Sequence, residues 1–155
     1  MTAPPAGGFV VSHGVDVAEV ARVTRSIERH GERFLDRVFT PDERAYCGAN
    51  KRAPEHFAAR FAAKEAVFKA LGTGWAQGVS WREIEVTRAP SGAPGVRLTG
   101  RAAAEIASEL GISAWLLSLS HTGSIAIASA IALCPERATE HPTGRPTGRP
   151  AERER

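Results

Sequence analysis

The chain has 155 residues, of which 43% are hydrophobic and 24% are charged, and its formal net charge is +3. These values are those of a soluble globular chain that is long enough for one domain with a hydrophobic core. The small positive charge is compatible with an anionic ligand or an acidic partner, but it is too weak to require a nucleic acid.

Cysteine usage and hydropathy indicate a cytoplasmic protein. The two cysteines, Cys47 and Cys134, are far apart in the sequence, so neither a disulfide framework nor a metal site is expected from them. The N-terminus lacks the basic start and the apolar run of a signal peptide. The longest apolar run, Ile125 to Leu133, is far shorter than a membrane span.

The first predicted elements are a strand and a helix. Residues 1–8 are rich in proline, glycine and alanine and are expected to form a loose extension. Apolar residues predict a strand over 9–15, and Asp16 then begins a helix that extends to about residue 30. Glu19 follows Asp16 at the spacing of a capping box.

Helix signals are clearest in the middle of the chain. The run Thr40-Pro41-Asp42-Glu43 predicts the start of a short helix, with threonine as its cap and proline in its first turn. A long helix is expected over 55–71, ending at Gly72-Thr73-Gly74. The remaining elements are expected at 83–87 and 96–99 (strands), 100–110 (helix), and 114–120 and 124–133 (strands).

The last segment, 134–155, differs in composition from the rest. It holds four of the ten prolines and repeats Thr-Gly-Arg-Pro over 143–150, with almost no apolar side chains to bury. Such a tail is expected to be disordered. The folded domain is therefore 9–133, and its predicted class is α+β: a small antiparallel sheet packed with one long central helix and shorter helices.

The long helix carries charges within an apolar pattern. Its apolar stripe consists of Phe57, Phe61, Phe68 and Leu71. At about 100° per residue, Lys64 falls in the middle of that stripe and Glu65 at its edge. Burying a charge is costly unless the charge is paired or binds something. The helix is therefore expected to line a site rather than only a core.

Two interpretations fit these charges. Glu65 and Lys69 have the i, i+4 spacing of a surface ion pair. Alternatively, Arg60, Lys64 and Lys69 supply positive charge for a phosphate group, which the place of Lys64 on the apolar stripe favours. The segment Gly72-Thr73-Gly74 would let backbone N–H groups approach an anion, although Gly72 is needed as a helix stop in any case.

Asp16 and His121 also have a structural and a functional interpretation. Asp16 is either a plain helix cap or a ligand of a hard cation such as magnesium. His121 closes an apolar strand directly after Ser120, and a lone histidine there is usually structural. Because adjacent strand residues point to opposite faces, a Ser–His hydrolase pair is disfavoured, and a contact with phosphate is the more natural function.

Arginines gather on one face of the first predicted helix. Arg22, Arg25 and Arg29 lie opposite its apolar residues, and the only acid between Arg22 and Arg29 in the sequence is Glu28. They form either a solvated helix surface or a docking surface for an acidic partner.

Three motifs occur in the order found in a known family. They are Gly14-Val15-Asp16 with Glu19 and Arg22, Arg60-Phe61-Ala62-Ala63-Lys64-Glu65-Ala66 with Lys69 and Gly72, and Ser118-Leu119-Ser120-His121. Through them the chain, over 9–133, resembles the 4′-phosphopantetheinyl transferases, and specifically the short holo-acyl-carrier-protein synthase type. The second motif is highly specific, whereas the other two are moderate signals alone.

The resemblance implies a reaction: transfer of the phosphopantetheine arm of coenzyme A to a serine of an apo acyl carrier protein, with release of adenosine 3′,5′-bisphosphate. It implies a homotrimer with the active site between subunits, and Mg²⁺ on the pyrophosphate with Asp16 and Glu65 as ligands. Asp16, Glu65 and Lys69 are then the catalytic residues. The residues expected to bind coenzyme A are Arg60, Lys64, Lys69, Gly72, Thr73, Gly74 and His121. In the family the first helix docks the acidic carrier; Arg22 matches that pattern, while Arg25 and Arg29 follow from periodicity.

Several alternatives stay open. The proton of the serine hydroxyl passes either to Glu65 or to a water on the metal. The carrier belongs to a fatty-acid, polyketide or peptide synthase. A coenzyme A-binding module without transferase activity is the alternative function. A small nucleic-acid-binding domain is a further rival, disfavoured because aromatic residues make up only 6% of the chain.

Overall fold

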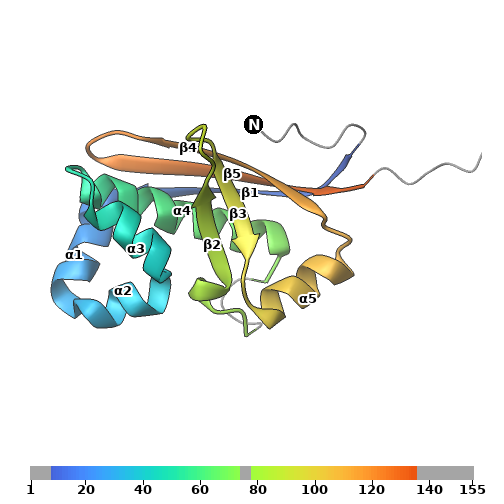
Figure 1. Ribbon diagram of the computed structural model, residues 1–155, viewed down its shortest axis with the longest axis horizontal. Coiled ribbons are helices and arrows are strands. Elements are labelled where there is room, and N and C mark those ends of the chain that lie inside the picture. Colours follow the sequence, from blue (N-terminus) through green and yellow to red (C-terminus); the bar gives the residue numbers. More distant parts are fainter. Residues whose placement is uncertain (1–7, 74–77, 136–155) are drawn as a thin grey trace, which may run out of the picture.

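A long helix and two antiparallel sheets build the fold (Figure 1). The computed structural model describes residues 8–73 and 78–135. The strands are β1 (Phe9–Glu19), β2 (Ile84–Arg88), β3 (Pro94–Leu98), β4 (Ala114–His121) and β5 (Ile125–Cys134). The helices are α1 (Val20–His30), α2 (Glu32–Val38), α3 (Pro41–Gly48), α4 (Ala53–Leu71), α5 (Arg101–Glu109) and the short 3₁₀ helix η2 (Trp81–Glu83). The predicted α+β class is confirmed.

The larger sheet has the strand order β1-β5-β4, and α4 packs against one of its faces. On that face β5 presents four fully buried alanines, Ala126, Ala128, Ala130 and Ala132. The sheet and the helix approach very closely at Gly14, where a Cβ atom would lie 1.9 Å from the carbonyl oxygen of Ala66. Gly14, in the first sequence motif, is therefore required by the contact between β1 and α4.

Strand β1 is longer than the sequence indicated. Asp16 pairs with Ala128 within the β1–β5 ladder, which continues to Glu19 opposite Ile125. Helix α1 begins at Val20, and its N-cap residue Glu19 makes no side-chain capping hydrogen bond. The prediction that Asp16 caps this helix was wrong, because pairing with β5 carries the strand past it. In the strand, the alternation of side chains places Asp16 on the same side as Gly14, toward α4.

Helix α3 and the end of helix α4 follow from local capping signals. Thr40 and Glu43 form the predicted capping box of α3. Helix α4 begins at Ala53, slightly earlier than expected, and ends at Gly72 with a φ of 72°. Helix α2 was not predicted; it is short, with 7 residues, and has no side-chain cap.

The second half of the chain follows the predicted order. Strands β2 and β3 form a hairpin, and β2 contacts α4. Strand β5 ends at Cys134, so the folded part extends just past the predicted boundary at 133. The predictions for 1–7, Gly74 and 136–155 lie outside the described residues. Within the described part, no helix is both long enough and apolar enough to cross a membrane.

Candidate active site

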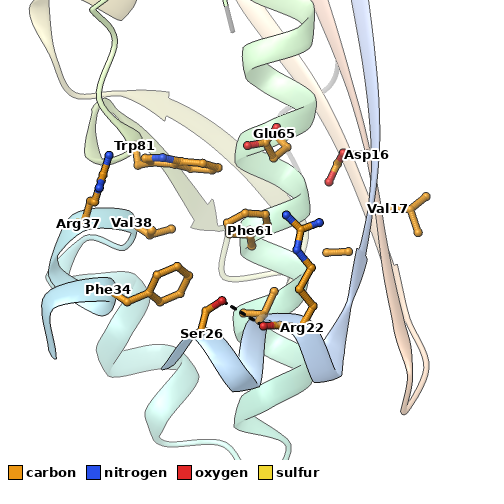
Figure 2. A pocket seen from close by; sticks show the side chains of 12 residues that line it. Asp16, Val17, Arg22, Ser26, Phe34, Arg37, Val38, Phe61, Glu65 and Trp81 are labelled. Atoms are coloured by element: carbon orange, nitrogen blue, oxygen red, sulfur yellow. Dashed lines mark hydrogen bonds between the residues drawn. The ribbon is translucent and has the colours of Figure 1, made fainter. Parts of the chain in front are cut away.

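A pocket of about 400 Å³ opens between β1, α1, α2 and α4 (Figure 2). Asp16 from β1 and Glu65 from α4 lie at one end of it, and the guanidinium of Arg22 from α1 points toward them. Apolar side chains form much of the remaining wall, among them Val23, Phe34, Val38, Phe61 and Trp81. We call this the carboxylate pocket. It combines an anionic end with an apolar wall.

Asp16 is held in place by Lys69. The Lys69 ammonium donates to Asp16 Oδ1 and to the carbonyl oxygen of Val15, both at 2.8 Å. These bonds tie β1 to the last turn of α4. The side chain of Asp16 is 16% exposed and that of Lys69 is 52% exposed, so the ammonium compensates the carboxylate while remaining open to solvent.

The two carboxylates suit a hard divalent cation. Mg²⁺ is usually bound through one or two carboxylates together with waters and substrate phosphates. Among the described residues, no group of three or more His, Cys, Asp or Glu side chains forms a metal cage. The donor set of Asp16 and Glu65 therefore fits an ion shared with a phosphorylated substrate rather than an ion enclosed by protein alone.

Lys64, in contrast, is a buried structural residue. Its side chain is fully buried, and its ammonium lies 2.8 Å from Glu43 Oε2. It also donates to the carbonyl oxygens of Trp81, at 3.0 Å, and Ile84, at 2.7 Å. Burial lowers the pKa of Lys64, and the neighbouring Glu43 carboxylate opposes that shift. Three acceptors occupy the three donors of the ammonium, so the expectation that Lys64 contacts phosphate is corrected.

A second cavity, of about 250 Å³, lies between α3, α4, β2 and β4 and is rich in cations and rings. Its polar and aromatic lining consists of Tyr46, His56, Arg60, Arg88 and His121. We call it the basic cavity. The Arg60 guanidinium stacks 4.1 Å from the centroid of Tyr46, and Arg88 donates to the Tyr46 hydroxyl at 2.6 Å. Arg60 is buried, and in the described structure its Nε has no hydrogen-bond partner.

The residues that end α4 are placed only in part. Gly72 is exposed and takes the left-handed conformation that ends the helix. Thr73 is buried, and its hydroxyl has no hydrogen-bond partner within the described residues. Gly74 lies outside the described residues. A role for this segment in binding an anion stays a prediction.

The arginine face of α1 is exposed, as predicted. Arg22, Arg25 and Arg29 are all exposed, and with Ser26, Glu28 and His30 they line a shallow surface hollow. Arg22 also lines the carboxylate pocket. The basic surface of α1 therefore continues directly into that pocket.

Sequence reasoning missed several residues of these sites. Phe34, Arg37 and Val38 line the carboxylate pocket from α2, the helix that was not predicted. The i, i+4 spacing of Phe34 and Val38 is the one local signal of an apolar helix face there. In the basic cavity, His56 is brought to His121 by tertiary packing between segments far apart in sequence, for which no local pattern exists.

The chain is similar to known proteins in both sequence and structure. The family model of the 4′-phosphopantetheinyl transferase superfamily matches residues 12–128. A holo-[acyl-carrier-protein] synthase of Desulforudis audaxviator is 51% identical over 130 residues, which are 84% of this chain and 98% of that protein.

Solved structures agree with this match. The holo-[acyl-carrier-protein] synthase of Neisseria meningitidis superposes with a TM-score of 0.73 at 32% identity, covering 80% of this chain and 98% of that one. A holo-(acyl-carrier-protein) synthase of Bacillus anthracis in complex with CoA (3′,5′-ADP) has a TM-score of 0.66 at 31% identity, covering 81% of this chain and 97% of that one.

Proposed function

The chain belongs to the 4′-phosphopantetheinyl transferase superfamily, and from this membership we propose a residue-level account of its reaction. It is a holo-[acyl-carrier-protein] synthase: it transfers 4′-phosphopantetheine from coenzyme A to a serine of an apo acyl carrier protein and releases adenosine 3′,5′-bisphosphate. One observation carries the account. Asp16 and Glu65, from separate elements, meet in one pocket of a chain that is 51% identical to such a synthase.

The carboxylate pocket is the proposed reaction centre. Asp16 and Glu65 would hold Mg²⁺, which when bound supplies positive charge to the oxygens of the pyrophosphate. Lys69 orients Asp16 through its 2.8 Å contact and adds a positive charge on the same side. Phe61 and Trp81 exclude water from one wall, which strengthens electrostatic interactions in the pocket.

The basic cavity is the proposed site for a phosphate group of coenzyme A. Arg60 brings a buried guanidinium with a free Nε, and His121 brings a ring nitrogen. Arg88 adds a second guanidinium to the same wall. Such donors suit a phosphate group, because charge-assisted hydrogen bonds to phosphate are stronger than neutral ones.

The acidic carrier protein is proposed to dock on α1. Its exposed arginines, Arg22, Arg25 and Arg29, form a positive surface that leads into the carboxylate pocket. Charge complementarity would orient the carrier so that its serine enters beside Asp16 and Glu65.

A homotrimer with shared active sites is also proposed. The face of the larger sheet opposite α4 carries exposed apolar side chains, namely Val15, Val17, Leu116, Ile125 and Ile127. An apolar patch of this kind is typical of a protein interface. Assembly would let the carboxylate pocket of one subunit and the basic cavity of another act on the same coenzyme A. Because coenzyme A and carrier proteins are its substrates, a cytoplasmic location is proposed as well.

The direct test is the intact mass of a purified apo acyl carrier protein after incubation with this protein, coenzyme A and magnesium. The expected result is the gain of one phosphopantetheine, lost when magnesium is chelated. Clear binding of coenzyme A with no gain on fatty-acid, polyketide and peptide synthase carriers would instead indicate a binding module. No gain and no binding would contradict both the function and the proposed sites.

A further inference from the structure

Glu55 contacts His121, which lines the basic cavity, and the account above leaves this contact unused. His121 Nδ1 donates to Glu55 Oε2 at 2.8 Å, which joins the first turn of α4 to the last residue of β4. The two side chains are 15% and 21% exposed, so the contact is largely shielded from water. Arg52 forms an ion pair with the same carboxylate oxygen at 3.6 Å.

The chemistry of this contact fixes the hydrogen on the imidazole ring. An ionised carboxylate only accepts hydrogen bonds, so Nδ1 of His121 must carry the hydrogen. In a neutral ring, Nε2 is then an acceptor and offers nothing to an anion. Nε2 can donate to a phosphate oxygen only when the ring is the imidazolium.

Other charged and titratable groups surround His121. From α4 these are His56 and Arg60, with Arg52 at the N-cap of that helix, Tyr46 on α3 and Arg88 on β2. The ring centroids of His56 and His121 are 5.4 Å apart. Burial lowers the pKa of His56, and the nearby charges of His121 and Arg60 lower it further. The neutral form of His56 is therefore favoured, whereas His121 is the histidine of this pair that contacts a carboxylate.

We propose that Glu55 is a positioning residue: it holds His121 with its hydrogen on Nδ1, so that binding of a coenzyme A phosphate in the basic cavity is coupled to uptake of one proton by His121. The inference deepens the proposed function and rests on its assignment of phosphate binding to His121. Nucleotide affinity should then fall as pH rises, whereas a His121 held in the other tautomer would bind independently of pH.

The test uses the full chain and adenosine 3′,5′-bisphosphate as the probe, with binding measured by calorimetry between pH 7 and 9. In this range the second ionisation of the phosphate, near pH 6, is nearly complete. The dissociation constant should rise with pH, by at most about tenfold per unit for one coupled proton. Heats measured in two buffers of different ionisation enthalpy should show uptake approaching one proton at pH 8 and above.

Glu55→Gln is the decisive variant. A glutamine amide both donates and accepts, so the neutral ring can place its hydrogen on Nε2 and donate to phosphate without taking up a proton. The dissociation constant should then rise less than about twofold per pH unit, and the affinity at pH 9 should at least equal that of the unmutated chain. Glu105→Gln, which loses an exposed ion pair on α5, is the matched control and should keep the full slope.

A purely structural role for Glu55 predicts something different: Glu55→Gln would weaken binding by the same factor at every pH, and that result would overturn the proposal. An unchanged slope would overturn it too. A measurement without substitution supports the test if the variant fails to fold. Nitrogen NMR of the histidine-labelled unmutated chain at pH 9 should show His121 with its hydrogen on Nδ1, and finding it on Nε2 would refute the inference.

The same experiments separate this inference from the proposed function. Dephospho-coenzyme A lacks the 3′-phosphate. If its dissociation constant no longer depends on pH, the coupled proton belongs to binding of the 3′-phosphate. If the dependence on pH remains, the proton belongs to binding of the pyrophosphate. Transfer to a carrier protein with pH-independent nucleotide binding would overturn the role of Glu55 alone. Absence of both transfer and binding would remove the proposed function and this inference with it.

Discussion

Asp16 and Glu65 lie at the same end of the carboxylate pocket, although they come from a strand and a helix far apart in the sequence. Asp16→Asn and Glu65→Gln keep the shape of each side chain but remove its negative charge. Each should lower the transfer rate about a hundredfold or more and raise the magnesium concentration needed for half-maximal rate. The measurement is initial transfer rate against magnesium concentration.

Glu105→Gln serves as the control for this pair as well, because it neutralises an exposed carboxylate on α5. Thermal unfolding should show that all three variants stay folded. If either pocket variant kept a near-normal rate at low magnesium, its residue would have to be removed from the metal site.

Lys64 illustrates how burial decides the role of a charge. Its ammonium is enclosed by Glu43 and two carbonyl groups, and Glu43 also accepts from the backbone N–H of Val86. Lys64→Met leaves the Glu43 carboxylate buried without its counter-ion and should cost about 3–5 kcal/mol of unfolding free energy. Adding Glu43→Gln should recover part of that loss, because the unpaired charge is gone. Urea unfolding of the two single variants and the double variant measures the coupling.

The competing interpretation of Lys64 makes a different forecast. If its ammonium contacted coenzyme A, Lys64→Met would weaken nucleotide binding while leaving the unfolding free energy nearly unchanged. The sequence placed Lys64 correctly on the apolar stripe of α4. It could not reveal the partner, because Glu43 comes from another helix and the carbonyl acceptors come from η2 and β2.

Helix α1 carries the exposed arginines on which the acidic carrier protein is proposed to dock. Arg25 is exposed on it and, unlike Arg22, does not line the carboxylate pocket. Arg25→Glu should therefore raise the KM for an acidic carrier protein by about three- to tenfold while leaving the KM for coenzyme A unchanged. Steady-state kinetics with each substrate varied in turn gives the comparison, and the effect should shrink as ionic strength rises.

Arg101→Glu, on the exposed surface of α5, provides the matched charge reversal. It should leave both KM values near those of the unmutated chain. An equal rise for carrier and coenzyme A in Arg25→Glu would rule out α1 as the docking surface.

At the level of elements, the sequence predicted what local chemistry determines. The capping box at Thr40 and Glu43 and the left-handed Gly72 were readable because each acts within one turn. The end of β1 was not, since its extension past Asp16 depends on pairing with β5. Helix α2 was missed because it is short and lacks a side-chain cap. These two elements carry much of the carboxylate pocket, so its residues were only partly predictable.

In the part of the chain that the structure describes, the helices leave one face of the larger sheet uncovered. On the larger sheet, α4 covers the alanine side of β5, while Ile125 and Ile127 on the opposite side are 41% and 45% exposed. Ile127 lies between Val17 of β1 and Ser120 of β4 in the ladder, on the central strand and near the end of the sheet where β4 turns into β5. The apolar pattern of β5 was visible in the sequence, but which half of it meets a partner depends on where α4 packs.

The proposed homotrimer gives this face its function, and Ile127→Lys tests it. A lysine there would bury a charge in the interface, so the variant should sediment as a monomer where the unmutated chain sediments as a trimer. Transfer should fall with assembly, because the carboxylate pocket and the basic cavity would no longer meet across subunits. Leu110→Lys changes an equally exposed apolar residue, 42% exposed at the end of α5, and should affect neither property. A monomeric unmutated chain with full activity, or an Ile127→Lys variant that still forms trimers, would exclude this face as the interface.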